Sequence, residues 1–195
     1  MRHFLKLCVL LSVALVPSLA FAHIGHGESA PIGFIAGFTH PFTGLDHLAA
    51  MLAVGIWSAM TTKRIWVAPV SFASLLLVGA LLGVAGVSLP VIEPVIAASL
   101  LVIGLLIAVQ VKLPVWAGAL IVGAFAVFHG AAHGTELAEV NNVAGALIGM
   151  VVATASIHIA GLAIGRFLMR YPLVWARAAG GAVSVLGLGF LVGIV

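Results

Sequence analysis

Long apolar stretches dominate this sequence, and they restrict what the chain can fold into more than any other feature. An α-helix rises about 1.5 Å per residue, so about 20 mostly apolar residues cross the ~30 Å hydrocarbon core of a membrane. Such stretches occur at 42–60, 66–88, 93–111, 114–134, 143–165 and 175–194. Because backbone polar groups inside a membrane must be paired within the segment, the sequence predicts an all-α, polytopic membrane bundle of six transmembrane helices.

The composition leaves little room for another kind of domain. Hydrophobic residues make up 64% of the chain and charged residues only 7%, which is far from the balance of soluble domains. We therefore expect residues 23–195 to form a single transmembrane domain whose main partner is the lipid bilayer. The formal charge of +3 comes from basic residues scattered singly or in pairs, so no nucleic-acid surface is expected. The oligomeric state stays open.

The first residues have the features of a secretory signal peptide. Arg2 and Lys6 are basic, residues 7–16 are apolar, and Ala20-Phe21-Ala22 matches a cleavage site. We expect a signal peptide over residues 1–22, which would place the mature N-terminus in the periplasm. If the segment instead remained as an additional helix with its start inside, the residues after it would still begin outside.

Charged residues in the connections indicate how the bundle is oriented. With the start outside, six crossings place all basic residues beyond the signal peptide on the cytoplasmic side. The connections on the opposite side contain no Lys or Arg and hold Glu93, Glu136 and Glu139. This distribution follows the positive-inside rule, and it predicts a multi-pass protein of the bacterial inner membrane.

Two groups of polar side chains interrupt the apolar stretches. Ionisable residues inside a membrane cost roughly 2.5 to 3.5 kcal/mol each, so they usually have a functional role. The first group opens the first predicted helix, where we expect Pro41 to begin the helix and His40 to cap it. The second group closes the fourth predicted helix. Together the two groups consist of His40, Asp46, His47, His129, His133 and Glu136.

The spacing of the second group places its ligands on one helix face. Residues four and seven positions apart nearly complete whole turns, so His129, His133 and Glu136 share a face. Gly130 and Gly134 leave room beside them for another helix. Since both groups lie toward the outer half of the membrane, we predict one shared metal site between the first and fourth transmembrane helices.

The ligand types narrow the choice of ion. Imidazole with carboxylate suits Ni²⁺, Co²⁺, Zn²⁺, Cu²⁺ or Fe²⁺ and disfavours Mg²⁺ and Ca²⁺, which prefer oxygen ligands. No thiolate ligand is expected, because the only cysteine, Cys8, lies in the predicted signal peptide. Asp46 would either bind the ion or orient an imidazole from behind it. The residues alone do not select one ion from the first group.

Apart from His3 in the predicted signal peptide, three further histidines lie outside these groups. His158, in the fifth predicted helix, is too deep to join the outer site. It is either a second station on the path or a structural hydrogen-bond partner, with Thr154 one turn away. Cleavage after Ala22 would leave His23 with a free amine beside its imidazole and His26 nearby, a combination that can chelate metal. A capture site is one interpretation of this terminus, and a terminus without a role is the other.

The two polar groups resemble the signatures of the HupE/UreJ family of nickel and cobalt permeases. The resemblance covers nearly the whole chain. It implies transport of Ni²⁺ or Co²⁺ as the substrate, no enzymatic activity, no prosthetic group, and a functional role for the six residues of the two groups. The matching motifs are His40-Pro41-x-x-Gly44-x-Asp46-His47 and Phe128-His129-Gly130-x-Ala132-His133-Gly134-x-Glu136.

The sequence has no Gly-x4-Gly-Lys-Ser/Thr loop, so we expect a gradient or trapping of the metal inside the cell, rather than ATP, to drive uptake. Three alternatives stand beside transport: a haem-binding electron-transfer subunit, an intramembrane metallohydrolase, and an assembly protein with structural histidines. Against the first, His129 and His133 on one helix cannot take opposite faces of one haem. Against the second, Gly130 stands where a His-Glu-x-x-His motif requires Glu.

Overall fold

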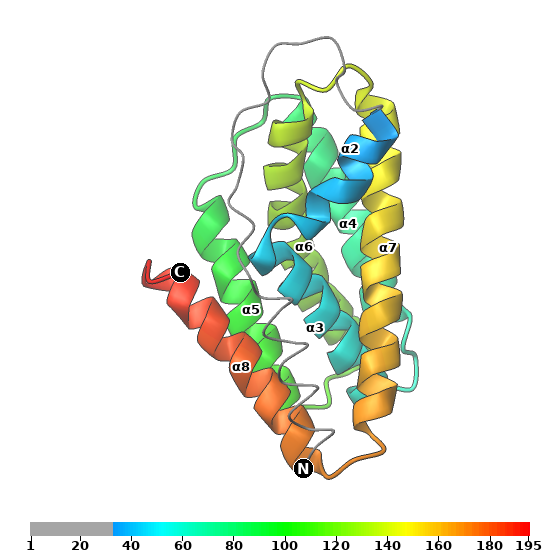
Figure 1. Ribbon diagram of the computed structural model, residues 1–195, viewed down its shortest axis with the longest axis vertical. Helices are drawn as coiled ribbons and strands as arrows, with labels where there is room; N and C mark the ends of the chain where they lie inside the picture. The colour runs from blue at the N-terminus through cyan, green and yellow to red at the C-terminus, as the bar shows by residue number, and fades with distance from the viewer. Residues whose placement is uncertain (1–32) are drawn as a thin grey trace, which may run out of the picture.

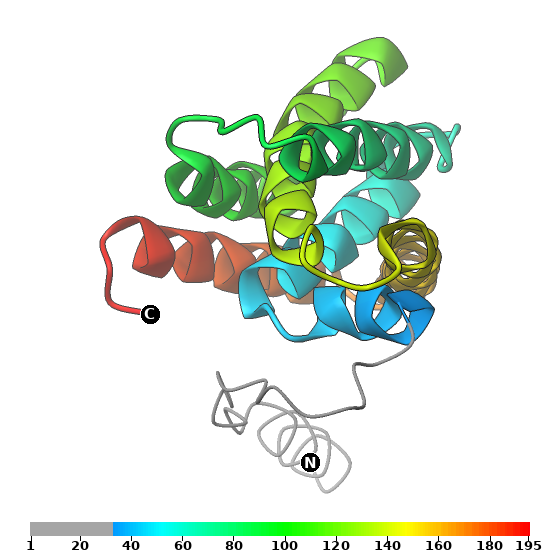
Figure 2. The same cartoon turned by 90° about the horizontal axis from the view of Figure 1, so that it is seen from above.

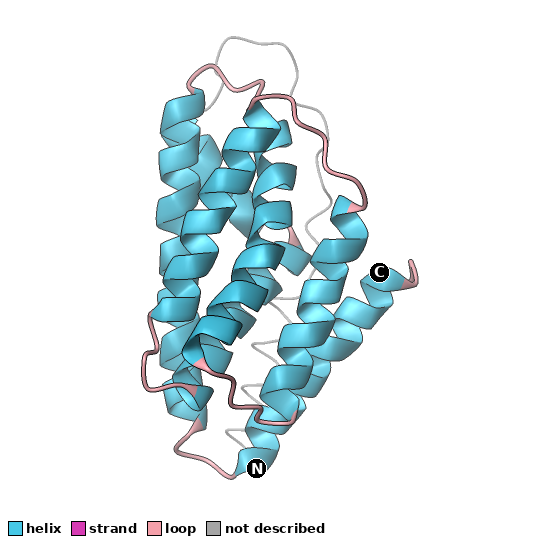
Figure 3. Ribbon diagram, turned by 180° about the vertical axis from the view of Figure 1, so that it is seen from behind, coloured by secondary structure: helices cyan, strands magenta, loops and turns pink. Residues whose placement is uncertain are grey.

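The computed structural model describes residues 33–195, and every regular element in that range is helical (Figures 1 and 3). The expected all-α class is therefore confirmed. The predicted signal peptide, together with His23 and His26, lies outside the described residues. In chain order the elements are α2 (Gly33–Thr39), the 3-10 turn η1 (His40–Phe42), α3 (Leu45–Thr61), α4 (Val67–Val84), α5 (Ile92–Ala108), α6 (Val115–Leu137), α7 (Val143–Leu168) and α8 (Leu173–Leu191).

These helices differ in whether they are long enough to cross a membrane. α4, α6, α7 and α8 are long and apolar enough, and α2, η1 and α3 together qualify as one span that is bent by 78°. α5 is apolar but has 17 residues, or about 25 Å of helix. By length and composition, residues 33–195 thus contain four candidate spanning helices, or five with the bent pair, and the six-helix count remains a prediction. Large apolar side chains such as Leu120 and Val185 are exposed, which suits contact with lipid.

The helices pack in pairs, with α3 near the centre of the bundle. α4 packs on α6, α5 packs on α8, and α7 packs on both α2 and α3. Seen from above, α2 lies beside the start of α7 (Figure 2). The shared core draws apolar side chains from five helices, among them Met51, Leu76, Ile103, Val122 and Met150. Through this core, α3 and α6, which carry most of the two polar groups, pack against the rest of the bundle.

Glycines allow a very close contact between α4 and α6. A Cβ atom added at Gly130 would lie 2.8 Å from the backbone nitrogen of Ala80 and would overlap the carbonyl oxygen of Leu76, and one added at Gly134 would overlap Ala80. The two helices therefore touch backbone to backbone. The space that Gly130 and Gly134 were expected to leave for another helix is occupied by α4. Because this contact permits little rotation, it determines where the histidines of α6 point.

The start of the first span differs from the prediction. We expected Pro41 to begin a continuous helix with His40 as its cap, but both residues belong to η1, and α3 begins only at Leu45 after an extended Gly44 (φ −95°, ψ 117°). Pro41 explains why α2 ends at Thr39 and passes into a 3-10 turn, because proline lacks the N–H of a helical hydrogen bond and collides with the preceding turn. The bend itself follows at Thr43 and Gly44, so His40 lies in the turn just before the bend of a broken helix, where side chains can build a binding site.

Candidate metal centre

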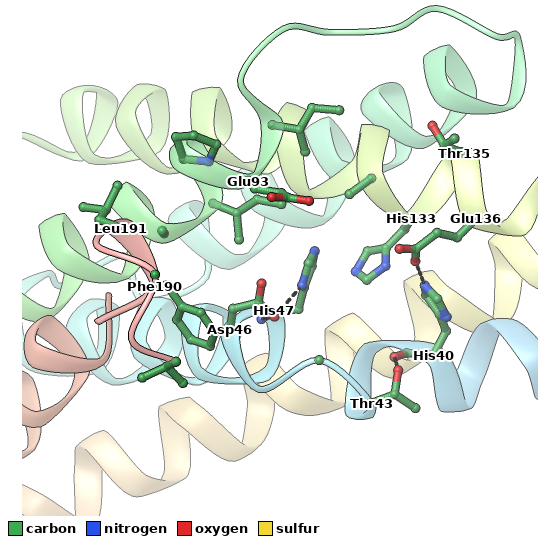
Figure 4. Close-up of a pocket in the computed structure, with 18 of the residues that line it drawn as sticks. His40, Thr43, Asp46, His47, Glu93, His133, Thr135, Glu136, Phe190 and Leu191 are labelled. Carbon is green, nitrogen blue, oxygen red and sulfur yellow. Dashed lines mark hydrogen bonds and ion pairs between the residues drawn. The ribbon is translucent and has the colours of Figure 1, made fainter. Parts of the chain in front are cut away.

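The two polar groups predicted from the sequence meet in space (Figure 4). The ring centroid of His133 is 4.2 Å from that of His47 and 4.7 Å from that of His40. The ring of His47 also lies 4.8 Å from that of His129. The imidazoles thus form one continuous cluster. Its elements are η1 with His40, α3 with Asp46 and His47, and α6 with His129, His133 and Glu136.

One end of the cluster combines two imidazoles with a carboxylate. Nε2 of His40 is 2.5 Å from Oε2 of Glu136. One ligand atom each of His40, His133 and Glu136 lies within 4.8 Å of the others. Nitrogen ligands bind transition ions at about 2.0–2.1 Å, so two ligands of one ion are at most about 4.2 Å apart. Small side-chain adjustments would bring these three atoms onto one ion.

Asp46 orients His47 and determines which nitrogen of its ring is free. Oδ1 of Asp46 accepts hydrogen bonds from the backbone N–H of His47 at 2.8 Å and from Nδ1 of its ring at 2.9 Å. Since a carboxylate can only accept, the ring proton is assigned to Nδ1. Nε2 then carries a free lone pair, and it is buried without a hydrogen-bond partner. Of the two roles expected for Asp46, the geometry supports the orienting one.

Ser99 of α5 orients His129 in the same way. The Ser99 hydroxyl donates its single proton to the carbonyl oxygen of Ile96 at 2.6 Å, so Oγ must accept the hydrogen bond from Nε2 of His129 at 2.9 Å. The free lone pair of His129 is therefore on Nδ1, which is buried without a partner. Sequence reasoning missed Ser99, because a serine in an apolar helix does not reveal which helix it faces.

His133 has no hydrogen bond at either ring nitrogen, although only 3% of the residue is exposed. An unpaired buried polar atom costs about 1–3 kcal/mol. His47, His129 and His133 therefore hold several unpaired nitrogen atoms in one cluster. A bound cation would remove this cost, because it would accept the free lone pairs directly.

A cavity of about 1010 Å³ adjoins the cluster. Six water molecules fill about 180 Å³ at ~30 Å³ each, so the cavity admits a divalent ion with its hydration shell. The cavity is bordered by η1, α3, the start of α5, the end of α6 and the end of the chain, including Phe190 and Leu191.

Three acidic side chains line this cavity. Glu93 was placed by the sequence in an outer connection without a role, but it borders the cavity together with Asp46 and Glu136 (Figure 4). None of the described residues that line the cavity is Lys or Arg. The local field therefore attracts cations. Sequence reasoning missed Glu93 because its distance from the two motifs along the chain hides its position beside them.

His158 stands apart from the six clustered residues. It lies in α7, and its ring contacts that of Phe72 in α4 at a centroid distance of 5.1 Å. Phe72 in turn contacts the ring of His129 at 5.5 Å. Neither Phe72 nor His158 lines the cavity. His158 therefore lies outside the cavity, separated from the ring of His129 by Phe72.

Comparison with known proteins agrees with the resemblance noted in the sequence. The family described as HupE / UreJ protein matches residues 11–190. Protein HupE of Rhizobium leguminosarum bv. viciae is 39% identical over 191 residues, which cover 96% of this chain and 98% of that protein. No solved structure matches the chain. Because both matches extend over nearly the whole sequence and include both polar groups, the chain belongs to the HupE/UreJ family.

Proposed function

We propose that this protein carries Ni²⁺ or Co²⁺ from the periplasm across the bacterial inner membrane into the cytoplasm. The observation that carries the proposal is the convergence of imidazoles from a broken span and from α6 beside an acidic cavity. The HupE/UreJ family is associated with nickel and cobalt transport, and the apolar helices indicate a multi-pass membrane protein. The imidazole and carboxylate ligands suit Ni²⁺ and Co²⁺ among several transition ions, and the family selects these two.

The geometry supports a stepwise exchange of ligands. A hydrated ion enters the cavity, where the carboxylates of Glu93 and Glu136 offset its charge. The ion then exchanges water for the imidazoles of His133 and His47, whose rings are in contact. His129 follows at the buried end of the cluster. Because each ligand is replaced by a neighbouring one, the ion never loses its whole coordination shell in a single step.

Secondary transport is proposed because the sequence lacks a phosphate-binding loop of the Gly-x4-Gly-Lys-Ser/Thr type. A membrane potential is a sufficient driving force. One elementary charge gains about 2.3 kcal/mol per 100 mV, so a divalent cation gains about 4.6 kcal/mol per 100 mV on moving inward. At 1.4 kcal/mol per factor of ten, this supports accumulation of roughly a thousandfold or more.

The alternative functions find no support in the geometry. His129 and His133 lie four residues apart on α6, so they do not reach opposite faces of a haem. Gly130, at the position where a metallohydrolase motif needs Glu, packs against the backbone of α4. Purely structural histidines would use their ring nitrogens in hydrogen bonds, whereas both nitrogens of His133 are unpaired.

Uptake of labelled Ni²⁺ and Co²⁺ by cells tests the proposal. Wild type, His47→Ala and His133→Ala are compared at matched expression, with Ser156→Ala as a control because this exposed serine donates only to Val152 within its own helix. We expect at least a tenfold loss of uptake in the two histidine variants and none in the control, since losing a ligand costs at least as much as losing its supporting residue. Equal uptake by all four proteins would refute the site assignment.

We also propose that the N-terminal histidines assist capture of the ion from the periplasm. After cleavage at Ala22, the amine and imidazole of His23 would form a chelating pair, with His26 close along the chain. His23→Ala with His26→Ala should then raise the metal concentration needed for half-maximal uptake and leave the maximal rate unchanged. A double variant with wild-type concentration dependence would contradict a capture role.

A further inference from the structure

We call the group of His40, His47, His129 and His133 the outer cluster. Another buried histidine, His158, lies on the far side of Phe72 from this cluster. His158 is 2% exposed and Phe72 is 1% exposed, and neither borders the cavity. The ring of Phe72 contacts both His129 of the outer cluster and His158. Phe72 thus links the innermost imidazole of the cluster to an imidazole on a different helix.

The hydrogen bonds of His158 leave one ring nitrogen free. Nδ1 of His158 is 2.8 Å from the backbone carbonyl oxygen of Thr154. A carbonyl oxygen can only accept, so the ring proton is on Nδ1 and Nε2 carries a free lone pair. Nε2 is buried without a hydrogen-bond partner, and so is Oγ1 of Thr154 one turn away on the same helix. This pattern, in which Nδ1–H is held by a backbone carbonyl while Nε2 stays free, is typical of metal-binding histidines.

A structural role does not account for this arrangement. The hydrogen bond of His158 stays within α7, so it does not connect α7 to another helix. The contact with Phe72 requires only a side chain of similar shape. An apolar residue would fill the same space without burying an unpaired nitrogen atom. The free nitrogen is therefore the property that sets histidine apart at this position.

The two environments differ in charge. The outer cavity has the carboxylates of Asp46, Glu93 and Glu136, whereas His158 and Thr154 offer a neutral imidazole and a hydroxyl. One imidazole and one hydroxyl hold a transition ion less firmly than several imidazoles together with carboxylates do. Conduction needs sites that are favourable enough to enter and weak enough to leave. A weaker site behind a stronger one fits release toward the far side of the membrane.

We propose that Nε2 of His158 and Oγ1 of Thr154 form an inner metal station on α7, which receives the ion from His129 when the ring of Phe72 moves aside. This station deepens the proposed function and rests on it. It separates capture, which belongs to the outer cluster, from translocation, which needs His158 as well.

Two measurements on the purified full-length protein test the inner station. Equilibrium binding of Ni²⁺ reports on the outer cluster, and the initial rate of Ni²⁺ entry into proteoliposomes containing a metal-sensitive dye, at saturating Ni²⁺, reports on translocation. For His158→Gln we expect a dissociation constant within about twofold of wild type and an entry rate at least tenfold lower. His133→Ala should lose both, and Ser156→Ala, two residues from His158 and exposed, should lose neither.

The outcomes separate this inference from the proposed function. If folded His158→Gln admits Ni²⁺ at the wild-type rate, the inner station is overturned and the proposed transport function stands. A tenfold loss of equilibrium Ni²⁺ binding in this variant also overturns the station, because His158 would then act through the outer cluster. Entry of neither Ni²⁺ nor Co²⁺ with the wild type overturns both proposals. If His158→Gln fails to fold, Thr154→Val takes its place in the same two measurements. This variant should fold, because the Thr154 hydroxyl has no hydrogen-bond partner that the substitution would remove. Entry reduced at least threefold with unchanged binding supports the station, and wild-type entry overturns it.

Discussion

Replacing Ser99 with alanine should weaken metal binding without removing any metal ligand. The Ser99 hydroxyl accepts the hydrogen bond from Nε2 of His129 and thereby keeps the free lone pair on Nδ1. Without the hydroxyl, the buried N–H has no acceptor. The ring then turns, or its proton moves to Nδ1. In both cases the nitrogen that faces the ion is lost.

The size of the effect follows from this geometry. A buried donor without its acceptor costs about 1–3 kcal/mol. Loss of a residue that orients a metal-binding histidine typically reduces metal affinity by about 10–100-fold, which corresponds to about 1.4–2.8 kcal/mol. The two ranges overlap. We therefore expect the dissociation constant of Ni²⁺ for Ser99→Ala to rise by about 10–100-fold.

Competition between the purified protein and a chelator of known affinity measures this change. Ser184→Ala is the matched control, because Ser184 is also a buried serine next to α5, but its hydroxyl bonds only to the backbone oxygens of Leu101 and Gly180. Ser99→Thr keeps a hydroxyl and should retain most of the affinity. An unchanged dissociation constant in Ser99→Ala would refute the reasoning, and so would an equal loss in Ser184→Ala.

Three further predictions test the packing, the charge and the orientation of the bundle. Gly130→Ala should lower the free energy of unfolding by about 1–3 kcal/mol and reduce Ni²⁺ binding, because the added Cβ overlaps α4. Gly181→Ala is the control, since a Cβ there meets open space, and it should change neither stability nor binding. Thermal unfolding and Ni²⁺ binding assays measure both quantities. Glu136→Gln should raise the Ni²⁺ dissociation constant several-fold, because it removes a carboxylate beside the imidazoles. Glu139→Gln is the control, since Glu139 does not line the cavity. Equal dissociation constants for Glu136→Gln and the wild type would contradict a ligand role for Glu136. A cysteine introduced at Lys63 should react with a membrane-impermeant thiol reagent only from the cytoplasmic side, and one at Glu139 only from the periplasmic side. Labelling of both cysteines from the same side would contradict the predicted orientation.

Much of the helical architecture could be predicted from local patterns. The stretch 143–165 became α7 (Val143–Leu168) and 114–134 became α6 (Val115–Leu137), because long apolar runs form helices wherever lipid or a core surrounds them. The shared face of His129 and His133 also depends only on helical periodicity. These features involve residues within a few turns of one another.

The break in the first span was not predicted, although its residues were recognised. Pro41 can begin a helix or end one, and local sequence does not distinguish the two outcomes. The packing of α2 against α7 decides for the break, since Gly33 and Gly37 allow close contact with the backbone of α7 and of the turn before it. The predicted cap position of His40 was wrong for this reason.

By itself, the sequence determined that the chain is helical, apolar and equipped with two groups of histidine and acidic side chains. Only the tertiary structure decided that His47 and His133 touch, that Ser99 faces His129, and that Glu93 borders the same cavity. The physical reason is that helical periodicity acts over a few residues, whereas Ser99 and His129 are 30 positions apart. Contacts over such distances depend on which helices pack together, and backbone contacts such as that of Gly130 with α4 determine this packing.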